Sequence, residues 1–357
     1  ENNMTVLHSM KIIDTAGVAQ GILIEDSALT VRDYLIALGE GDVANHTRWA
    51  KIGYSPTMNT TQSDIISQAG VYTFPTGATA MAVIGGANDD GTPAIYAGTS
   101  TGGSLTTLID TGKNFTTVPV VAGDTVIMEK AGASPEFGIV TSLTSTNQLN
   151  LAAGFSHGGS GSGRTYHVIQ KALSTGAQAV DIEYLDTAYA TKREIVILDG
   201  AAEVAMVASP YRINSMVVIA AGSTGAAVGA VTLKAPTPGT PIFANISLGY
   251  TRARQAIYTV PAATTLFINK MTAGFSSAAG TKWEYARIIL RANLHPDTTF
   301  LTGNIFYPYG EIIANNATVV IPYQIPIKFP AKTDIRVTGV ASDAGVAVCS
   351  LRGWLET

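Results

Sequence analysis

Three carboxylates lie close together in the sequence: Asp181, Glu183 and Asp186. Alternate side chains of a β-strand point to the same face, so Asp181 and Glu183 are expected to share one. Two carboxylates held in this way could bind a cation or serve as the acid and base of a glycosidase. Acidic residues also commonly end a strand before a turn, and no accompanying motif supports the enzymatic interpretation. We therefore predict that the chain is not an enzyme.

Motifs for metal binding, phosphate binding and nucleophilic catalysis are missing from the sequence. The five histidines form no His-x-x-x-His arrangement, and a single cysteine excludes an intramolecular disulfide and a cysteine-based zinc site. Cys349 lies in an apolar run, which predicts a buried side chain on a strand. Residues 88–91, Asn-Asp-Asp-Gly, lack the spaced ligands of a calcium loop. We predict no catalytic residue, no cofactor and no metal ion.

Aromatic side chains are the candidate interface or ligand-binding residues. Phe306, Tyr307 and Tyr309 fall within four positions, and Trp283 and Tyr285 alternate along a predicted strand. Exposed aromatic rings contact sugars and partner proteins because they combine a large apolar surface with a polar edge. Packing in the core or between subunits explains the same pattern.

The predicted strand at 283–292 has two different faces. One face carries Glu284, Ala286, Ile288, Leu290 and Ala292, and the other carries Trp283, Tyr285, Arg287, Ile289 and Arg291. The second face mixes aromatic side chains with cations, as a hydrated interface does. An ordinary solvated sheet face has the same composition, and both interpretations stay open.

The elements that position these residues are predicted to be strands. Short apolar runs alternate with clusters of Gly, Pro, Asn and Asp, which is the pattern of a β-sandwich or barrel. The dipeptide Asp199-Gly200 between Arg193–Leu198 and Val204–Val207 predicts a hairpin. Val71–Phe74 is predicted to be another strand, which leads into a turn. The fold class is therefore predicted to be all-β.

Changes in composition divide the predicted fold into three parts. Residues 1–43 are expected to be an N-terminal arm with a short helix, capped by Thr30 and ended by Gly39. Short strands between Gly/Ser-rich stretches predict a small inserted β-barrel domain at 88–171. The longer strands of 44–87 and 172–357 predict a main domain with a jelly-roll-like β-sandwich.

The composition limits the partners of the protein. Charged residues make up only 13% of the chain, hydrophobic residues 46%, and the net charge is −4. A chain of this charge lacks the basic field that attracts nucleic acid, so no nucleic-acid partner is expected. No apolar run approaches the roughly 18 residues of a membrane span, and no signal peptide is visible. The low charge predicts that apolar surface is buried against other subunits.

Two sets of segments resemble structural proteins of tailed bacteriophages. Residues 108–126, 140–151 and 166–168 resemble a small β-domain that recurs in phage virion proteins. They include Ile-Asp-Thr-Gly at 109–112 and Gly-Asp-Thr-Val at 123–126. Residues 44–84, 181–234 and 330–337 are similar to uncharacterised structural proteins of marine and cyanobacterial tailed phages. The resemblance implies a sandwich interrupted by an insertion at 88–171, located in the virion, and it brings no catalytic residues.

These observations lead to one expected function and two alternatives. The chain is expected to be a homo-oligomeric virion component of the capsid surface or tail, assembled in the host cytoplasm and bound to itself and to other virion proteins. The first alternative is a receptor- or carbohydrate-binding module of the adsorption apparatus, whose aromatic residues contact a host surface glycan. The second is a polysaccharide depolymerase that acts through Asp181, Glu183 or Asp186.

Overall fold

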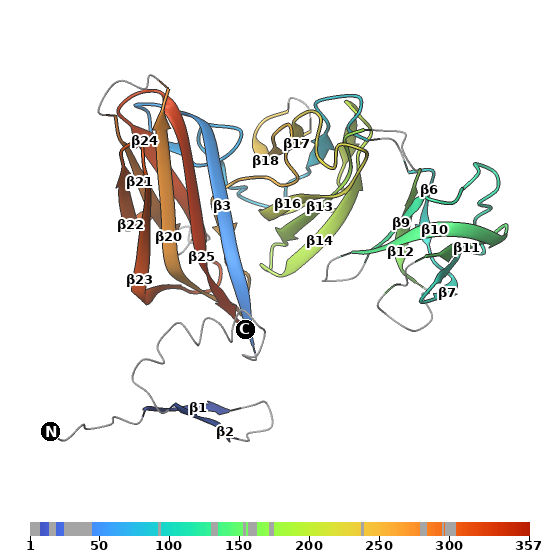
Figure 1. The fold of residues 1–357 in the computed structure, drawn as a ribbon, viewed down its shortest axis with the longest axis horizontal. Helices are drawn as coiled ribbons and strands as arrows, with labels where there is room; N and C mark the ends of the chain where they lie inside the picture. Colours follow the sequence, from blue (N-terminus) through green and yellow to red (C-terminus); the bar gives the residue numbers. More distant parts are fainter. Residues whose placement is uncertain are drawn as a thin grey trace.

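The computed structural model describes most of the chain from residue 45 onward. The described ranges are 45–91, 94–129, 135–152, 155, 163–170, 175–236, 239–278, 284–294, 296 and 305–357, with the backbone of 8–13 and 19–24. Every regular element in these ranges is a β-strand, which confirms the all-β fold class (Figure 1). Accordingly, they contain no helix long and apolar enough to cross a membrane. The helix predicted at 30–39 lies outside the described residues.

The N-terminal part contains one described pair of strands. β1 (His8–Ile13) and β2 (Ala19–Ile24) form an antiparallel two-stranded sheet. All other strands belong to three groups, which Figure 1 shows one beside the next.

The first group is a pair of facing antiparallel sheets, which we call the terminal sandwich. Its four-stranded sheet has the order β23 (Thr318–Phe329), β20 (Thr265–Ser277), β25 (Gly345–Glu356), β3 (His46–Met58). Its other sheet has the order β19 (Ile257–Thr259), β24 (Asp334–Ala341), β21 (Ala286–Asn293), β22 (Tyr307–Ala314), with β4 (Ser63–Asp64) paired to β24. Alternating apolar residues such as Ile268, Met271, Leu290, Val337 and Leu351 fill the space between the sheets.

The second group, which we call the central sheets, has its own core. One sheet has the order β14 (Thr191–Ile197), β13 (Ala177–Leu185), β16 (Arg212–Ala221), and the other has the order β15 (Glu203–Ala205), β5 (Ala82–Ile84), β17 (Val231–Lys234), β18 (Ile242–Ile246). Their core includes Val83, Val180, Ile182, Val231 and Phe243. The described parts of 44–87 and 172–357 therefore enclose two large hydrophobic clusters, and a jelly-roll connection of their strands stays a prediction.

The third group is a single sheet of seven strands. Its order is β6 (Tyr96–Thr99), β12 (Thr165–Ile169), β9 (Thr125–Met128), β10 (Glu136–Ser145), β11 (Gln148–Leu151), β8 (Thr107–Ile109), β7 (Gly102–Ser104). These strands lie within the predicted insertion at 88–171 and surround a cluster that includes Leu108, Phe115, Val126, Leu149 and Tyr166. That this part is a separate domain, and that its sheet closes into a barrel, stay predictions.

The segments that connect the seven-stranded sheet to the central sheets lie next to each other. The amide of Gly176 donates to the carbonyl of Asp89 at 2.9 Å, so the two connecting segments lie side by side. Asp90 is fully buried there, and its carboxylate accepts the amides of Ala177 (3.0 Å), Val228 (2.9 Å) and Gly229 (2.7 Å). Three backbone amides satisfy the hydrogen-bonding capacity of this carboxylate. Asp90 therefore holds the segments at Ala177 and at Val228–Gly229 together.

Candidate interaction surface

The structure separates the aromatic residues that were expected to form one surface. Phe306 is buried, and its ring stacks on Phe74 with the centroids 5.6 Å apart. Tyr309 packs edge-on against Phe329, a core residue of the terminal sandwich, with the centroids 4.9 Å apart. Tyr307, between these two aromatics in sequence, is half-exposed.

Tyr285 and Tyr307 are both exposed but lie at opposite ends of β21. The amide of Tyr285 donates to Ser342 Oγ at 3.0 Å just before β21 begins, whereas Tyr307 pairs with Ala292 near its end. Seven residues of extended chain separate these ends by roughly 23 Å. The two rings therefore cannot contact the same sugar unit. Trp283, the fifth candidate, lies outside the described residues.

The predicted division of the 283–292 strand into two faces is confirmed for its described residues. Ala286, Ile288, Leu290 and Ala292 lie in the core of the terminal sandwich. On the other face, Arg287 forms a bidentate ion pair with Glu311, at 2.6 and 2.7 Å. Arg291 donates to Thr338 Oγ1 at 3.0 Å and to Gln62 Oε1 at 3.3 Å.

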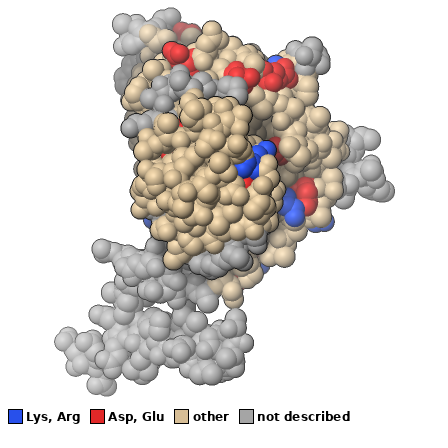
Figure 2. Space-filling view, turned by 90° about the vertical axis from the view of Figure 1, so that its right-hand side faces the viewer, with Lys and Arg blue, Asp and Glu red and all other residues tan. Residues whose placement is uncertain are grey.

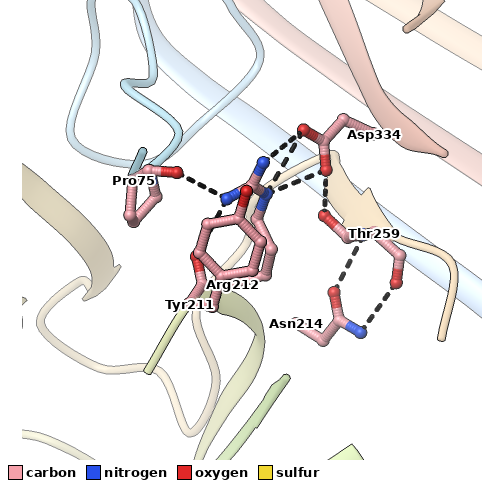
Figure 3. Close-up of polar contacts among 6 residues, drawn as sticks. All are labelled: Pro75, Tyr211, Arg212, Asn214, Thr259 and Asp334. Carbon is pink, nitrogen blue, oxygen red and sulfur yellow. Dashed lines mark hydrogen bonds and ion pairs between the residues drawn. The ribbon is translucent and has the colours of Figure 1, made fainter. Parts of the chain in front are cut away.

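A buried ion pair joins the central sheets to the terminal sandwich (Figure 3). Arg212 of β16 donates from Nε and Nη2 to the two carboxylate oxygens of Asp334 of β24, both at 3.0 Å, and neither residue is more than 3% exposed. Thr259 Oγ1 donates to the same carboxylate, and Asn214 exchanges two hydrogen bonds with the backbone of Thr259 at 2.9 and 3.0 Å. Burial lowers the pKa of Arg212, but Asp334 outweighs it and the pKa is raised. This cluster is a structural connection because its own members satisfy its charges.

A second buried carboxylate lies beneath Phe306. Asp64 Oδ2 accepts the amide of Tyr72 at 2.6 Å and lies 3.6 Å from Arg336 Nη1. Burial raises the pKa of Asp64 to about 6, although Arg336 and the Tyr72 amide act in the opposite direction. The guanidinium carbon of Arg336 lies 3.9 Å from the centre of the Phe306 ring. Phe306 therefore covers this ion pair.

The three carboxylates that suggested catalysis have partners within the protein. Arg193 donates from Nη1 to Asp181 at 2.8 Å and from Nη2 to Glu183 at 3.0 Å, across neighbouring strands. Burial raises the pKa of Asp181, and Arg193 opposes that shift. Asp186 Oδ1 accepts the amides of Ala188 and Ala190, both at 2.9 Å, in the following turn. The arrangement is that of a salt-bridged strand pair and a capped turn.

Burial changes the pKa of two further side chains, Cys349 and Lys51. Cys349 is buried and burial raises the pKa of its thiol to about 12, so the prediction of a buried strand cysteine is confirmed. Burial lowers the pKa of Lys51 to about 8, against the effect of Glu183. Lys51 donates to the carbonyl of Asn214 and lies over the ring of Tyr258. Within the described ranges, no group of three or more His, Cys, Asp and Glu residues could hold a metal ion.

The outer face of the four-stranded sheet, which we call the open sheet face, was not recognised in the sequence. Directly paired residues of adjacent strands lie on the same face of a sheet. One half of the face is formed by two cross-strand rows: Ile52, Ser350, Thr272 and Val320, and Tyr54, Val348, Gly274 and Thr318. Ile52, Val320 and Val348 expose 46, 47 and 42% of their surface. The three aliphatic side chains of this half are open to solvent, whereas the guanidinium carbon of Arg254 lies 3.8 Å from the centre of the Tyr54 ring.

The other half of the open sheet face is basic. Its two rows contain Ala50, Arg352, Lys270 and Pro322, and Arg48, Trp354, Phe267 and Lys328. The Phe267 and Trp354 rings stack with their centroids 5.3 Å apart, and Lys328 Nζ lies 5.8 Å from the centre of Phe267. Alternation along each strand is visible in the sequence, but the rows depend on pairing between four distant segments.

Comparison with known proteins adds little to this geometry. No family model matches the chain, and no curated protein matches it. VP17, a capsid protein of bacteriophage P23-77, is weakly similar in structure, with 8% sequence identity and a TM-score of 0.13 over 87% of this chain and 97% of that protein. A TM-score this low does not establish a shared fold, so no functional conclusion is drawn from the similarity.

Proposed function

We propose that this protein is a non-enzymatic structural subunit of a tailed-phage virion, located at the capsid surface or in the tail. It acts by associating with copies of itself and with other virion proteins after synthesis in the host cytoplasm. The observation that carries the proposal is the apolar half of the open sheet face. Three aliphatic side chains on three strands, Ile52, Val320 and Val348, are each more than two-fifths exposed, as in a surface that a partner covers.

Two features of the whole chain support the same function. The few charged side chains favour close subunit contact; Figure 2, which looks onto the end formed by the seven-stranded sheet, shows a mostly uncharged surface. The sequence resemblance to phage virion proteins supports assembly into a virion. In the described chain, the candidate acids Asp181 and Glu183 are engaged by Arg193, which supports a non-enzymatic role.

The association state of the purified chain tests the proposal. We expect light scattering to show a discrete oligomer, and we expect Val348→Glu to reduce it to the monomer because a charge is placed in the apolar rows. Val71→Glu is the matched control, because Val71 is 64% exposed and lies in a loop outside this face. A wild-type chain that stays monomeric and binds no other virion protein contradicts the proposal.

The alternative, a carbohydrate-binding module, rests on the exposed ring of Tyr307 beside Ile305, which are 53 and 41% exposed. An aromatic ring next to an apolar side chain can pack on one sugar face. Binding to a host-glycan array that Tyr307→Ala abolishes, in a chain that remains monomeric, favours this alternative over assembly.

A further inference from the structure

The basic half of the open sheet face has a local excess of positive charge. Over the whole chain, Asp and Glu outnumber Lys and Arg by 26 to 22. Nevertheless, each strand of this sheet contributes one cation to the two basic rows: Arg48, Lys270, Lys328 and Arg352. None of the four forms an ion pair in the described part of the chain. The nearest acidic residue of the face is Glu356, in the row beyond Arg48.

Two of these cations lie directly opposite each other, and their repulsion lowers the stability of the fold. Lys270 of β20 is directly opposite Arg352 of β25, and the outer neighbours in this row are the uncharged Ala50 and Pro322. Like charges directly opposite in an antiparallel pair are destabilising. An opposite charge at one of these positions would favour the isolated fold, so the repulsion points to negative charge supplied from outside the chain.

We infer that the open sheet face docks an acidic protein surface, with carboxylates over the basic rows and apolar side chains over the Ile52, Val320 and Val348 rows. The apolar rows are continuous with the basic rows on the same four strands. A nucleic acid or a sulfated polysaccharide would neutralise the cations and leave the aliphatic side chains in water. A protein partner covers both halves with matching chemistry.

The partner surface differs from the open sheet face itself. If this face paired with its own copy about a two-fold axis, one of two arrangements would result. Either the basic halves of the two copies face each other, or the basic half of each copy covers Ile52 and Val348 of the other. Both arrangements leave unpaired charge in the contact. The docked surface is therefore a different one, an acidic protein surface that carries apolar side chains beside its carboxylates.

The inference rests on the proposed function, and one pair of variants tests it separately. Lys270→Glu/Arg352→Glu reverses the central basic row, while Lys192→Glu/Arg252→Glu makes the same change of net charge at exposed sites outside this face. Soluble poly-L-glutamate is the acidic probe, and single-stranded DNA and dextran sulfate are the comparison polyanions. We expect the wild type and the control to bind poly-L-glutamate in a salt-sensitive manner, and the reversed variant to lose about tenfold or more in affinity.

Stability gives a second readout that distinguishes a docking role from a structural one. The single change Lys270→Glu converts the repulsive pair with Arg352 into a cross-strand ion pair. We expect it to raise the thermal midpoint by about 1–2 °C while weakening the binding of poly-L-glutamate. A lower midpoint shows that Lys270 serves the fold and overturns the inference.

The remaining outcomes separate the inference from the proposed function. Equal binding of poly-L-glutamate by the wild type and the reversed variant, or binding of DNA or dextran sulfate alone, overturns the acidic-protein inference even if the chain oligomerises. A monomeric wild type whose poly-L-glutamate binding depends on Lys270 and Arg352 contradicts self-assembly and leaves the docking surface supported.

Discussion

Three of the buried carboxylates, Asp334, Asp90 and Asp64, differ in how they are stabilised. Asp334 is neutralised by the bidentate Arg212, and Asp90 accepts three backbone amides. Asp64 has a single amide donor and a more distant Arg336, and its Oδ1 has no hydrogen-bond partner within the described structure. Because burial penalises the charged form and Asp64 has few donors, burial raises the pKa of Asp64 to about 6.

Asp64 is predicted to make the stability of the protein depend on pH. Its pKa in the folded protein, about 6, lies above the ordinary value of 3.8, so the folded state binds the proton more tightly than the unfolded chain. The contribution to stability is complete below pH 4 and is lost as the pH rises through about 6, a decrease of about 2–3 kcal/mol in the free energy of unfolding. Urea unfolding at a series of pH values measures this decrease.

Asp64→Asn removes the titrating group and keeps an acceptor for the Tyr72 amide. We expect the variant to lose most of the decrease between pH 4 and 6, whereas Asp343→Asn, at an exposed turn, retains the wild-type profile. Identical profiles for Asp64→Asn and the wild type contradict the assignment.

Two ion pairs each connect two strands, and their burial determines how much the loss of one partner changes the free energy of unfolding. Arg212 and Asp334 connect β16 to β24 in an environment from which water is excluded. Arg287 and Glu311 connect β21 to β22 with equally good geometry but in contact with solvent. Removal of one partner leaves an uncompensated buried charge only in the first pair.

Arg212→Met is therefore predicted to destabilise the protein by about 3–5 kcal/mol, because the Asp334 carboxylate remains buried without its cation. Arg212→Met/Asp334→Leu is expected to recover part of that loss, since no charge remains. Urea unfolding of both variants measures the difference, with Arg287→Met as the exposed control that changes stability much less. If the double variant is less stable than Arg212→Met, the Asp334 carboxylate stabilises the fold even without Arg212, which contradicts the prediction.

Two strand predictions failed for reasons that lie beyond the local sequence. Asp199-Gly200 makes the predicted turn, closed by a bridge between Asp199 and Ala202. However, β14 and β15 then enter different sheets, and β15 pairs with β5. Residues 71–74 form a loop and no strand. The alternating side chains of Tyr72 and Phe74 are buried in a cluster with Phe306. Turn chemistry is local, whereas pairing partners are chosen by the whole chain.

The chain leaves the central sheets after Asp90 and returns to them at Gly176, and these two positions lie side by side. The hydrogen bond between Gly176 and Asp89 connects the two segments, and the seven-stranded sheet beyond them has its own hydrophobic cluster. A smaller contact, in which Ile127 and Ile169 pack against Ala179 and Ile195, connects the two parts. Most apolar burial thus lies within each part, and the division into a main domain and an insertion stays a prediction.

Replacement of residues 92–174 by a short Gly-Ser linker is predicted to leave a folded protein. The clusters of the terminal sandwich and of the central sheets and the Asp90 anchor are retained, whereas the small cluster around Ala179 and Ile195 loses Ile127 and Ile169. Circular dichroism and cooperative thermal unfolding with a slightly lower midpoint are the expected results. An aggregated or unfolded product shows that the seven-stranded sheet is required for the rest to fold.

The sequence by itself determined that the chain forms strands and which residues of one strand share a face. Ala286, Ile288 and Leu290 are buried and Arg287 and Arg291 point away, because side-chain direction alternates as a local property of extended backbone. Cys349 was placed correctly for the same reason.

Only the tertiary structure decided which strands lie next to one another. The separation of Tyr307 from Tyr309 depends on the irregularity of the β21–β22 pair between Leu290 and Arg291. The position of Lys270 opposite Arg352 depends on the irregularity between Ile268 and Lys270. Pairing between distant segments is selected by the burial of both faces together, so no single segment carries the information that creates the open sheet face.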